Sequence, residues 1–435
     1  MKISVIGCGY LGAVHAAAMA SLGHEVVGVD VDASRVASLA AGLPPFYEPG
    51  LPELLRSGVE RGALTFSTNL REAKGAAVHF VCVGTPQRPD GPGADLTFVD
   101  AAFTALHEIV APGDVVVGKS TVPVGTAARL AAELAEAVPG AHLVWNPEFL
   151  REGFAVGDTL SPDRVVYGVD GAAPAATEAL DAVYASVLAA GTPRIVTDFA
   201  TAELVKVAAN SFLATKISFI NAMAELCETA GGDVVALADA IGHDERIGRR
   251  FLGAGLGFGG GCLPKDIRAF VARADELGAE NAVAFLREVD AINLRRRARM
   301  VEVTEEVCGG SVAGRTIGVL GAAFKPESDD VRDSPALDVA ATLAARGAHV
   351  VVADPQATAN AAAVRPELRY TTNALEACRD ADVVLLLTEW REFRELDPDD
   401  LGAVVHGRRM VDGRNVLDPA RWRGAGWTYR ALGRP

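Results

Sequence analysis

The sequence predicts an α/β protein in which two doubly wound domains are joined by a long central helix. In the first and last thirds of the chain, short apolar runs alternate with helical patterns, which is typical of parallel strands connected by helices. Between them, Ala202 to Thr229 carries apolar residues at helical spacing without proline or glycine, and Gly231 then ends the pattern. A segment of about 28 residues makes a helix of roughly 42 Å, which suits a connector or a dimerisation helix.

Continuous apolar runs mark the strands that we expect. The first sheet is predicted to contain Ile3–Ile6, Glu25–Val29, Ala77–Val83, Val115–Val117 and Leu143–Trp145. The second sheet is predicted to contain Thr316–Leu320, His349–Ala353, Val383–Leu387 and Arg409–Val411. We therefore divide the chain into an N-terminal α/β domain (1–196), a helical middle (197–300) and a C-terminal α/β domain (301–435).

Composition excludes several classes of protein. The formal net charge of −15 over 435 residues leaves no broad basic surface for nucleic acid, so an anionic ligand would need a locally basic pocket. The six cysteines form no C-x-x-C pair, so neither a zinc site nor a disulfide framework is expected, and we predict no metal. No signal peptide and no apolar run of about 18 residues is present, so we expect a cytoplasmic protein without a membrane partner.

A glycine-rich turn, Gly7–Gly12, follows the first predicted strand and precedes a helix. Gly7 permits a tight turn, and Gly9 lets the backbone approach a pyrophosphate at the helix N-terminus. Gly12 allows the helix to pack closely on the strand. With strand, turn and helix in this order, the pattern predicts a dinucleotide site rather than a tight turn without a ligand.

An acidic residue completes the dinucleotide pattern. Asp30 ends the second strand, where a carboxylate accepts hydrogen bonds from both ribose hydroxyls and repels a 2′-phosphate. We therefore expect NAD rather than NADP, although Arg35 is of a residue type that can hold such a phosphate. In the C-terminal domain, Gly318–Gly321 lacks the third glycine, so that segment binds either a different nucleotide moiety or nothing.

The densest glycine cluster runs from Gly253 to Gly261 and ends at Cys262. Glycines cost conformational entropy, which is understandable where backbone amides lie against a sugar or phosphate; a flexible loop is the alternative. Pro264 is typical of the first turn of a helix, so we expect Cys262 just before a helix N-terminus, whose dipole favours the thiolate. Asp266 follows four residues later and is expected on the same face. The pattern fits a nucleophile as well as a small buried residue.

Two further pairs of polar residues have a spacing of four. Lys206 and Asn210 share a face of the long helix, where a cation and an amide can hold an oxyanion or simply face solvent. Asn146 is expected to cap a helix that begins at Pro147. Glu148 and Glu152 would then share a face, either as a general base with its neighbour or as complements of the helix dipole.

Together these motifs resemble the UDP-glucose/GDP-mannose dehydrogenase family over nearly the whole chain. The segments that carry the resemblance are Gly7–Gly12, Phe46–Leu51, Val83–Pro86, Ser120–Pro123, Asn146–Glu152, Glu203–Asn210, Phe258–Asp266, Phe324–Pro326 and Asp412–Arg414. Cys8 stands where relatives often carry threonine or another small residue. The resemblance implies two Rossmann-like domains, one for NAD and one for a sugar nucleotide, and a homodimer or higher homo-oligomer built on the central helix.

The resemblance also implies the reaction. A nucleotide-sugar alcohol would be oxidised to a carboxylate by two hydride transfers to NAD, through a thiohemiacetal and then a thioester on Cys262. UDP-glucose, giving UDP-glucuronate, is the expected substrate, and GDP-mannose and UDP-N-acetylmannosamine are the alternatives. A single-step dehydrogenase of a hydroxy acid, with Cys262 merely structural, and a non-catalytic NAD-binding or scaffold protein are the competing hypotheses.

Roles follow from the resemblance at the matching positions. The implied catalytic residues are Thr121, Glu148, Lys206, Asn210, Cys262 and Asp266. Lys206 and Asn210 would stabilise oxyanions, Asp266 and Thr121 would position water or move protons, and Glu148 would assist thioester hydrolysis. The implied NAD-binding residues are Gly7, Gly9, Tyr10, Leu11, Gly12, Asp30, Arg35, Thr85, Pro86, Thr121, Glu152, Lys265 and Arg332. The implied sugar-nucleotide residues are Glu148, Phe149, Leu150, Lys206, Asn210, Arg246 (reaching a neighbouring subunit), Phe251, Gly253, Gly255, Gly257, Phe258, Gly259, Lys325 and Arg414.

Overall fold

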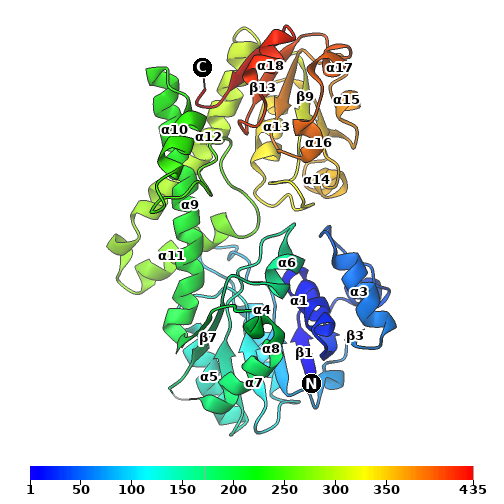
Figure 1. The fold of residues 1–435 in the computed structure, drawn as a ribbon, viewed down its shortest axis with the longest axis vertical. Helices are drawn as coiled ribbons and strands as arrows, with labels where there is room; N and C mark the ends of the chain where they lie inside the picture. The colour runs from blue at the N-terminus through cyan, green and yellow to red at the C-terminus, as the bar shows by residue number, and fades with distance from the viewer. Residues whose placement is uncertain (172, 435) are drawn as a thin grey trace. The chain divides into compact units, whose positions relative to one another are not determined.

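The computed structural model describes residues 1–171 and 173–434, drawn in Figure 1. The chain forms two compact units. The first contains Met1–Ala209 and Arg268–Leu277, and the second contains Asn210–Ile267 and the chain from Gly278 onward. The predicted long helix is present as α9 (Phe199–Ala230), one unbroken helix of 32 residues that contains the boundary between the units. The three-part division of the sequence stays a prediction.

The first unit is built on one sheet with the strand order β3-β2-β1-β4-β5-β6-β7-β8. Its strands are β1 (Lys2–Ile6), β2 (Glu25–Val29), β3 (Leu64–Ser67), β4 (Val78–Val81), β5 (Val115–Gly118), β6 (His142–Trp145), β7 (Val165–Val169) and β8 (Arg194–Asp198). All five predicted strands are confirmed. The prediction missed the edge strands β3 and β8, which have exposed positions and no continuous buried run, and also missed the buried β7.

Helices cover both faces of this sheet, as expected for a doubly wound fold. One hydrophobic cluster joins the sheet to α1, α3, α6, α7 and α8, and a second joins it to α4, α5 and the start of α9. The bounds are α1 (Tyr10–Ser21), α2 (Ala33–Ala40), α3 (Leu51–Glu60), α4 (Thr97–Leu106), α5 (Thr126–Ala137), α6 (Ala155–Leu160), α7 (Pro174–Val183) and α8 (Ala185–Ala189).

The order of the strands determines where a ligand can bind. From β1 the chain moves outward to β2 and β3 and then returns to β4 on the other side of β1, so the order of the strands reverses between β1 and β4. Doubly wound sheets bind their ligands at the carboxyl ends of the strands at such a reversal. The strand pairs are parallel except β6 with β7, which meet through Trp145 and Gly168. The five predicted strands are parallel as expected, and the antiparallel pair involves β7, which was not predicted. The reversal brings the amino end of β7 to the edge where β6 ends.

The second unit contains a sheet of six parallel strands in the order β11-β10-β9-β12-β13-β14. These are β9 (Thr316–Leu320), β10 (His349–Ala353), β11 (Arg369–Thr371), β12 (Val383–Leu386), β13 (Arg409–Asp412) and β14 (Thr428–Ala431). The four predicted strands are confirmed; the short β11 and β14 were missed because both sit at edges with exposed positions.

The remaining helices complete the second unit and part of the first. Their bounds are α10 (Val234–Gly242), α11 (Leu263–Glu276), α12 (Phe285–Val307), α13 (Pro335–Ala345), α14 (Thr358–Val364), α15 (Ala374–Ala377), α16 (Arg391–Arg394), α17 (Pro398–Gly402) and α18 (Pro419–Gly424). Among the described residues, no helix is long and apolar enough to cross a membrane. No group of three or more potential metal ligands occurs in the same part of the chain.

Candidate functional site

The glycine turn after β1 has the geometry that its sequence predicts. Gly7 adopts a positive φ of 87° and donates its amide to Val29 at 2.8 Å. A Cβ added at Gly12 would lie 1.8 Å from the carbonyl oxygen of Gly7, so only glycine allows this packing. Gly9 precedes α1, and a Cβ added there would meet nothing within 4 Å. Gly9 is therefore not required by packing within the protein, and it leaves open space at the helix N-terminus, the kind of position that favours anions.

Asp30 links this turn to the end of β2. Its carboxylate accepts a hydrogen bond from the amide of Cys8 at 2.7 Å and one from Asp32 at 2.9 Å. Arg35 donates to both oxygens of Asp30 at 3.0 Å and also pairs with Asp32. Two carboxylates around one guanidinium leave a net negative charge, which disfavours a 2′-phosphate and fits ribose hydroxyls.

The segment around Glu48 has a structural purpose that the sequence did not reveal. Tyr10 donates its hydroxyl to the buried carboxylate of Glu48, which also accepts the amides of Gly153 at 2.6 Å and Ala155 at 2.7 Å. Burial raises the pKa of the Tyr10 hydroxyl, and the nearby carboxylates of Glu48 and the buried Glu152 raise it further. Glu48 thus holds the start of α6 beside the glycine turn.

The helix predicted to begin at Pro147 is absent, and this prediction was wrong. The chain from Asn146 to Leu150 is irregular, and α6 begins only at Ala155, so Glu148 and Glu152 do not share a helical face. The side chain of Asn146 is buried instead of capping a helix. It donates to the carbonyl of Val166 at 2.9 Å and accepts from Lys119 at 3.0 Å.

Glu148 is held from three directions. One carboxylate oxygen accepts the amides of Phe149 at 2.7 Å and Leu150 at 3.0 Å, and the other lies 3.1 Å from the ammonium of Lys119. Burial alone would raise the pKa of Glu148, but the charge and hydrogen bond of Lys119 outweigh burial and lower it. Lys119 was not among the predicted site residues, because it stands alone at the end of an apolar strand.

The ring of Phe149 lies against two cations. The guanidinium carbon of Arg164 is 3.9 Å from the ring centroid, and the ammonium of Lys206 is 5.7 Å from it. Arg164 directly precedes β7, so the reversed strand brings this arginine to the edge of the sheet where β6 ends. Leu150 and Leu11 pack on the hydrophobic core of the first unit.

Residues from neighbouring strands meet at the same edge. The buried Thr85, after β4, donates its hydroxyl to the carbonyl of Thr121, after β5, at 2.8 Å. Pro86, next to Thr85, is exposed. The structure therefore brings the glycine turn, Thr85, Thr121 and Glu148 to the carboxyl ends of the parallel strands, where a doubly wound sheet binds its ligand.

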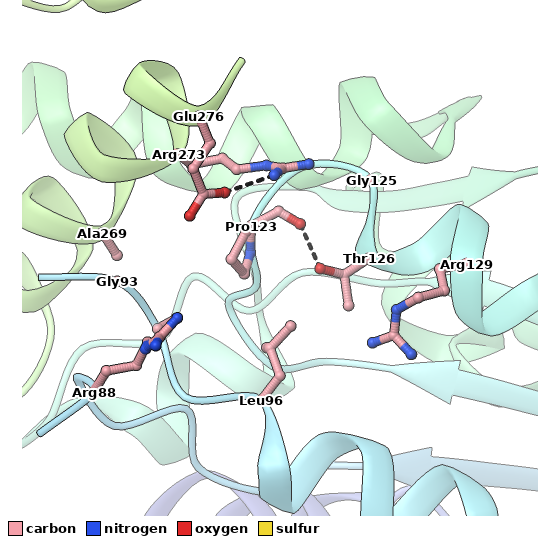
Figure 2. A pocket seen from close by; sticks show the side chains of 11 residues that line it. Arg88, Gly93, Leu96, Pro123, Gly125, Thr126, Arg129, Ala269, Arg273 and Glu276 are labelled. Carbon is pink, nitrogen blue, oxygen red and sulfur yellow. Dashed lines mark hydrogen bonds and ion pairs between the residues drawn. The ribbon is translucent and has the colours of Figure 1, made fainter. Parts of the chain in front are cut away.

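A nearby cavity of about 310 Å³ contains none of the predicted site residues (Figure 2). Three arginines line it, and each is neutralised: Arg273 pairs with Glu276, Arg129 with Asp100 and Glu133, and Arg88 with Asp90. Arg273 also donates two hydrogen bonds to the carbonyl of Val124. The cavity is therefore stabilised by its own ion pairs and offers no excess charge to an anion.

In the second unit, the predicted position of Cys262 is confirmed. Cys262 is exposed and directly precedes α11, and its carbonyl accepts the first helical hydrogen bond, from the amide of Asp266, at 2.9 Å. The carboxylate of Asp266 is buried and accepts hydrogen bonds from the side chains of Asn210 and Lys265, both at 2.7 Å. The other five cysteines are buried.

The glycine loop before Cys262 differs in part from its prediction. A Cβ added at Gly255, Gly257 or Gly259 would lie 2.4, 2.1 or 2.2 Å from atoms of Gly413, Asn293 or Asp333. At these three positions protein, rather than a ligand, takes the space that the glycines leave. Only Gly253 among the four proposed loop glycines is exposed, with nothing within 4 Å of an added Cβ.

Two buried asparagines that the sequence analysis missed hold this loop. Asn293 accepts the amide of Phe258 at 2.7 Å and donates to its carbonyl at 2.9 Å. Asn221 accepts the amide of Gly255 at 2.9 Å. Both asparagines are fully buried, and burying a side-chain amide is costly without such partners.

The candidate basic residues fall into two groups. Arg414 donates to the carbonyls of Leu387 at 2.7 Å, Gly257 at 3.0 Å and Phe324 at 3.3 Å, and therefore joins three loops. Lys325 lies over the ring of Phe324. Arg246 and Arg332 are more exposed.

Arg246 is 88% exposed and pairs with Asp244. Arg332 is also exposed and pairs with Asp330 at 2.6 Å. Phe251 has a positive φ of 66°, which is strained for a residue with a Cβ and is often found at functional sites.

Comparisons with known proteins identify relatives along the whole length of the chain. Residues 1–188, 200–295 and 318–419 match the NAD binding, central and UDP binding domains of the UDP-glucose/GDP-mannose dehydrogenase family. The chain is 41% identical to the UDP-glucose 6-dehydrogenase of Rhizobium meliloti (strain 1021), with 100% of both chains covered. It is 41% identical to the UDP-glucose 6-dehydrogenase TuaD of Bacillus subtilis (strain 168), covering 100% of this chain and 93% of that protein. A solved UDP-glucose dehydrogenase from the archaeon Pyrobaculum islandicum is 40% identical, with a TM-score of 0.90 and coverage of 100% and 98%.

Proposed function

Because this chain belongs to the UDP-glucose/GDP-mannose dehydrogenase family, we propose that it oxidises UDP-glucose to UDP-glucuronate with NAD as the oxidant. The observation that carries the chemistry is the position of Cys262, exposed at the N-terminus of α11 beside the buried pair Asn210 and Asp266. A thiolate is favoured at such a helix end. A cytoplasmic location is part of the same proposal.

The residues around the glycine turn fit NAD. Gly7, Gly9 and Gly12 would hold the pyrophosphate at α1, and Asp30 would accept the ribose hydroxyls, with Tyr10, Leu11 and Arg35 around them. The proposed contacts further along the chain are Thr85, Pro86, Thr121, Glu152, Lys265 and Arg332. NAD, when bound, supplies the acceptor for the hydride in each oxidation.

Two oxidations and one hydrolysis account for the product. In the first oxidation the alcohol carbon loses a hydride and its hydroxyl loses a proton, which Asp266 or a water held by Thr121 accepts. The sulfur of Cys262 then bonds to the aldehyde carbon, and Lys206 and Asn210 stabilise the oxyanion. Loss of a second hydride from that carbon leaves a thioester. Water, assisted by Glu148, adds to the thioester, the carbon–sulfur bond breaks, and the carboxylate leaves.

The sugar nucleotide would be bound mainly by residues of the second unit. Arg414, Lys325, Phe251, Gly253 and Phe258 are the proposed contacts, together with Phe149 and Leu150. Because Arg414 already joins three loops, we expect it to act as much by shaping the pocket as by its charge. Arg246 is exposed, which suits a contact with the sugar bound by a neighbouring subunit.

A homodimer built on α9 is the second part of the proposal. Phe212, Phe219 and Leu226 are 67, 48 and 60% exposed and follow one another at intervals of seven residues, so they lie along one face of the helix. A second copy of α9 is the occupant that such a heptad stripe fits. We expect Phe219→Glu to lower the molar mass measured by light scattering, while Phe98→Glu, on a similarly exposed phenylalanine of α4, leaves it unchanged. A wild-type protein that is monomeric at micromolar concentration would contradict this part.

The stoichiometry of the reaction tests the function. We expect two NADH per sugar and an acid product from UDP-glucose, with little turnover of GDP-mannose or UDP-N-acetylmannosamine. Cys262→Ala should abolish formation of the acid. One NADH with a free aldehyde or ketone, or an acid-forming Cys262→Ala variant, would contradict the two-step reaction. Preference for another of the three sugar nucleotides would change the substrate but not the chemistry.

A further inference from the structure

Lys119 is buried where a charge is costly. It directly follows β5, and its side chain is only 4% exposed. A lysine is rarely buried to this extent unless it is paired. Its ammonium lies 3.1 Å from the carboxylate of Glu148 and 3.0 Å from the side-chain oxygen of Asn146. Tyr184 donates to the same Asn146 oxygen at 2.8 Å, so Lys119, Glu148, Asn146 and Tyr184 belong to one buried network.

The other titratable groups that face this pair in the described part of the chain are neutral near pH 7. Burial raises the pKa of Cys82 and that of Tyr184 to about 12. Burial also lowers the pKa of His15 well below its ordinary value. Two further cations, Arg164 and Lys206, lie against the neighbouring ring of Phe149, and neither forms an ion pair with Glu148 among the described residues. Burial opposes ionisation of Glu148, and Lys119 is the charged group that favours it most.

The hydrogen bonds of Glu148 leave part of its capacity open. A carboxylate has about four acceptor positions, and the amides of Phe149 and Leu150 and the ammonium of Lys119 take three of them. The plane of the carboxylate is thereby fixed, with about one position left for a further donor. A water molecule is a donor of this kind.

We propose that Lys119 is a positioning residue, which keeps Glu148 ionised and oriented to take a proton from the water that cleaves the thioester. This inference rests on the proposed function, in which the thioester forms on Cys262. As the water oxygen bonds to the thioester carbon, one water O–H bond breaks and its proton passes to Glu148. The carbon–sulfur bond then breaks, the thiolate leaves, and Glu148 returns the proton to solvent. Lys119 itself gains and loses nothing in this step.

Replacing Lys119 with methionine tests the proposal. Without the ammonium, the pKa of Glu148 should rise by about one unit or more, as expected for the loss of an opposite charge at this distance. Glu148 would then be protonated at a higher pH. In the plot of hydrolysis rate against pH, the acid limb should therefore move upward by about one pH unit, and at a pH below that limb hydrolysis should be about tenfold slower than in the wild type. Acid quenching and intact mass measurement detect the accumulated thioester, and the first NADH is expected to appear at the wild-type rate.

Two further variants separate charge from structure. Lys119→Arg keeps the positive charge and should restore much of the wild-type pH profile. Tyr184→Phe removes one hydrogen bond to Asn146 but leaves the ion pair, so its pH profile should equal that of the wild type. A shift as large in Tyr184→Phe as in Lys119→Met would overturn the proposal, since general loosening of the network would then explain both.

Failure of the inference differs from failure of the proposed function. If Glu148→Gln hydrolyses the thioester as fast as the wild type, or no thioester forms at all, the assignment of the chemistry is wrong. If Glu148→Gln is slow but Lys119→Met keeps the wild-type profile, only the role of Lys119 is wrong. Should Lys119→Met not fold, the double variant Lys119→Met/Glu148→Gln leaves no unpaired charge and should match Glu148→Gln in rate. Additional slowing in the double variant would overturn the inference.

Discussion

Asn210 donates its side-chain amide to the buried carboxylate of Asp266 at 2.7 Å, and so joins α9 to the first turn of α11, directly after Cys262. A buried carboxylate is costly without such donors, because burial removes its hydration. Asn210 is the partner of Asp266 that comes from α9, whereas Lys265 belongs to α11 itself. Asn210 is therefore an informative site for mutation.

We predict that Asn210→Ala lowers kcat by about 10²–10³-fold, since it removes both a donor for the oxyanion and the partner of Asp266. The neighbouring Ser211 lies on the same helix and is also buried, but its hydroxyl has no hydrogen-bond partner among the described residues. Ser211→Ala is therefore a matched control that should keep the wild-type kcat. Steady-state kinetics with UDP-glucose measure both, and equal losses in the two variants would contradict the prediction.

The glycine turn predicts opposite effects for two similar substitutions. Gly12→Ala should prevent or greatly weaken folding of the first unit, because the new Cβ would lie 1.8 Å from the carbonyl oxygen of Gly7. Gly9→Ala meets no protein atom within 4 Å and should fold normally, but it should bind NAD more weakly because its methyl group occupies the space beside the helix N-terminus. Circular dichroism and calorimetric titration with NAD measure the two effects. Normal NAD affinity in Gly9→Ala would argue against the pyrophosphate position.

A second pair of glycines separates stability from substrate binding. Gly257 has a φ of 86°, and its added Cβ would lie 2.1 Å from the side-chain oxygen of Asn293, so Gly257→Ala should destabilise the protein by about 1–3 kcal/mol. Gly253→Ala has open space and should leave stability unchanged while raising KM for the sugar nucleotide. Urea unfolding and steady-state kinetics distinguish the two. Equal stability losses would show that the space at Gly253 is not open.

The ion pair of Lys119 and Glu148 predicts how stability depends on pH. The pKa of Glu148 is lowered, so its contribution is present above the ordinary carboxyl value of about 4.3 and is lost as pH falls through the lowered value. The pKa of Lys119 is raised by Glu148 despite burial, so its contribution is present below about 10.4 and is lost as pH rises through the raised value. Urea unfolding of Lys119→Met/Glu148→Gln should therefore show a flatter dependence than the wild type at both extremes. Parallel curves for the two proteins would contradict the prediction.

Features that are determined by residues close together in the sequence were predicted correctly. The glycine turn, the position of Cys262 before α11 and nine strands follow from turn chemistry, proline placement and apolar runs. The pattern at Asn146 and Pro147 satisfied the same rules and still failed, because the buried ammonium of Lys119 uses the asparagine side chain that would have capped a helix. That competition involves residues 27 positions apart and is invisible to any local rule.

Long-range contacts also explain what was missed at the glycine loop. Gly257 and Asn293 are brought together only when α12 packs beside the loop, so neither residue alone indicates that the loop is filled by protein. Edge strands such as β8 escaped prediction for a different reason, since their exposed side chains give no continuous apolar run. Residues that hold a site in place are therefore harder to infer from sequence than residues that carry its chemistry.

The antiparallel pairing of β6 and β7 determines where Lys206 lies. Because β8 is parallel to β7, it ends at the edge of the sheet opposite to the glycine turn. Helix α9 begins at the very next residue, Phe199. From Phe199 to Lys206 the helix rises about 10 Å in the direction back toward the glycine turn. Lys206 therefore lies near the ring of Phe149. If β7 were parallel to β6, the same helix would start at the edge of the sheet that carries the glycine turn, and Lys206 would lie farther from that edge.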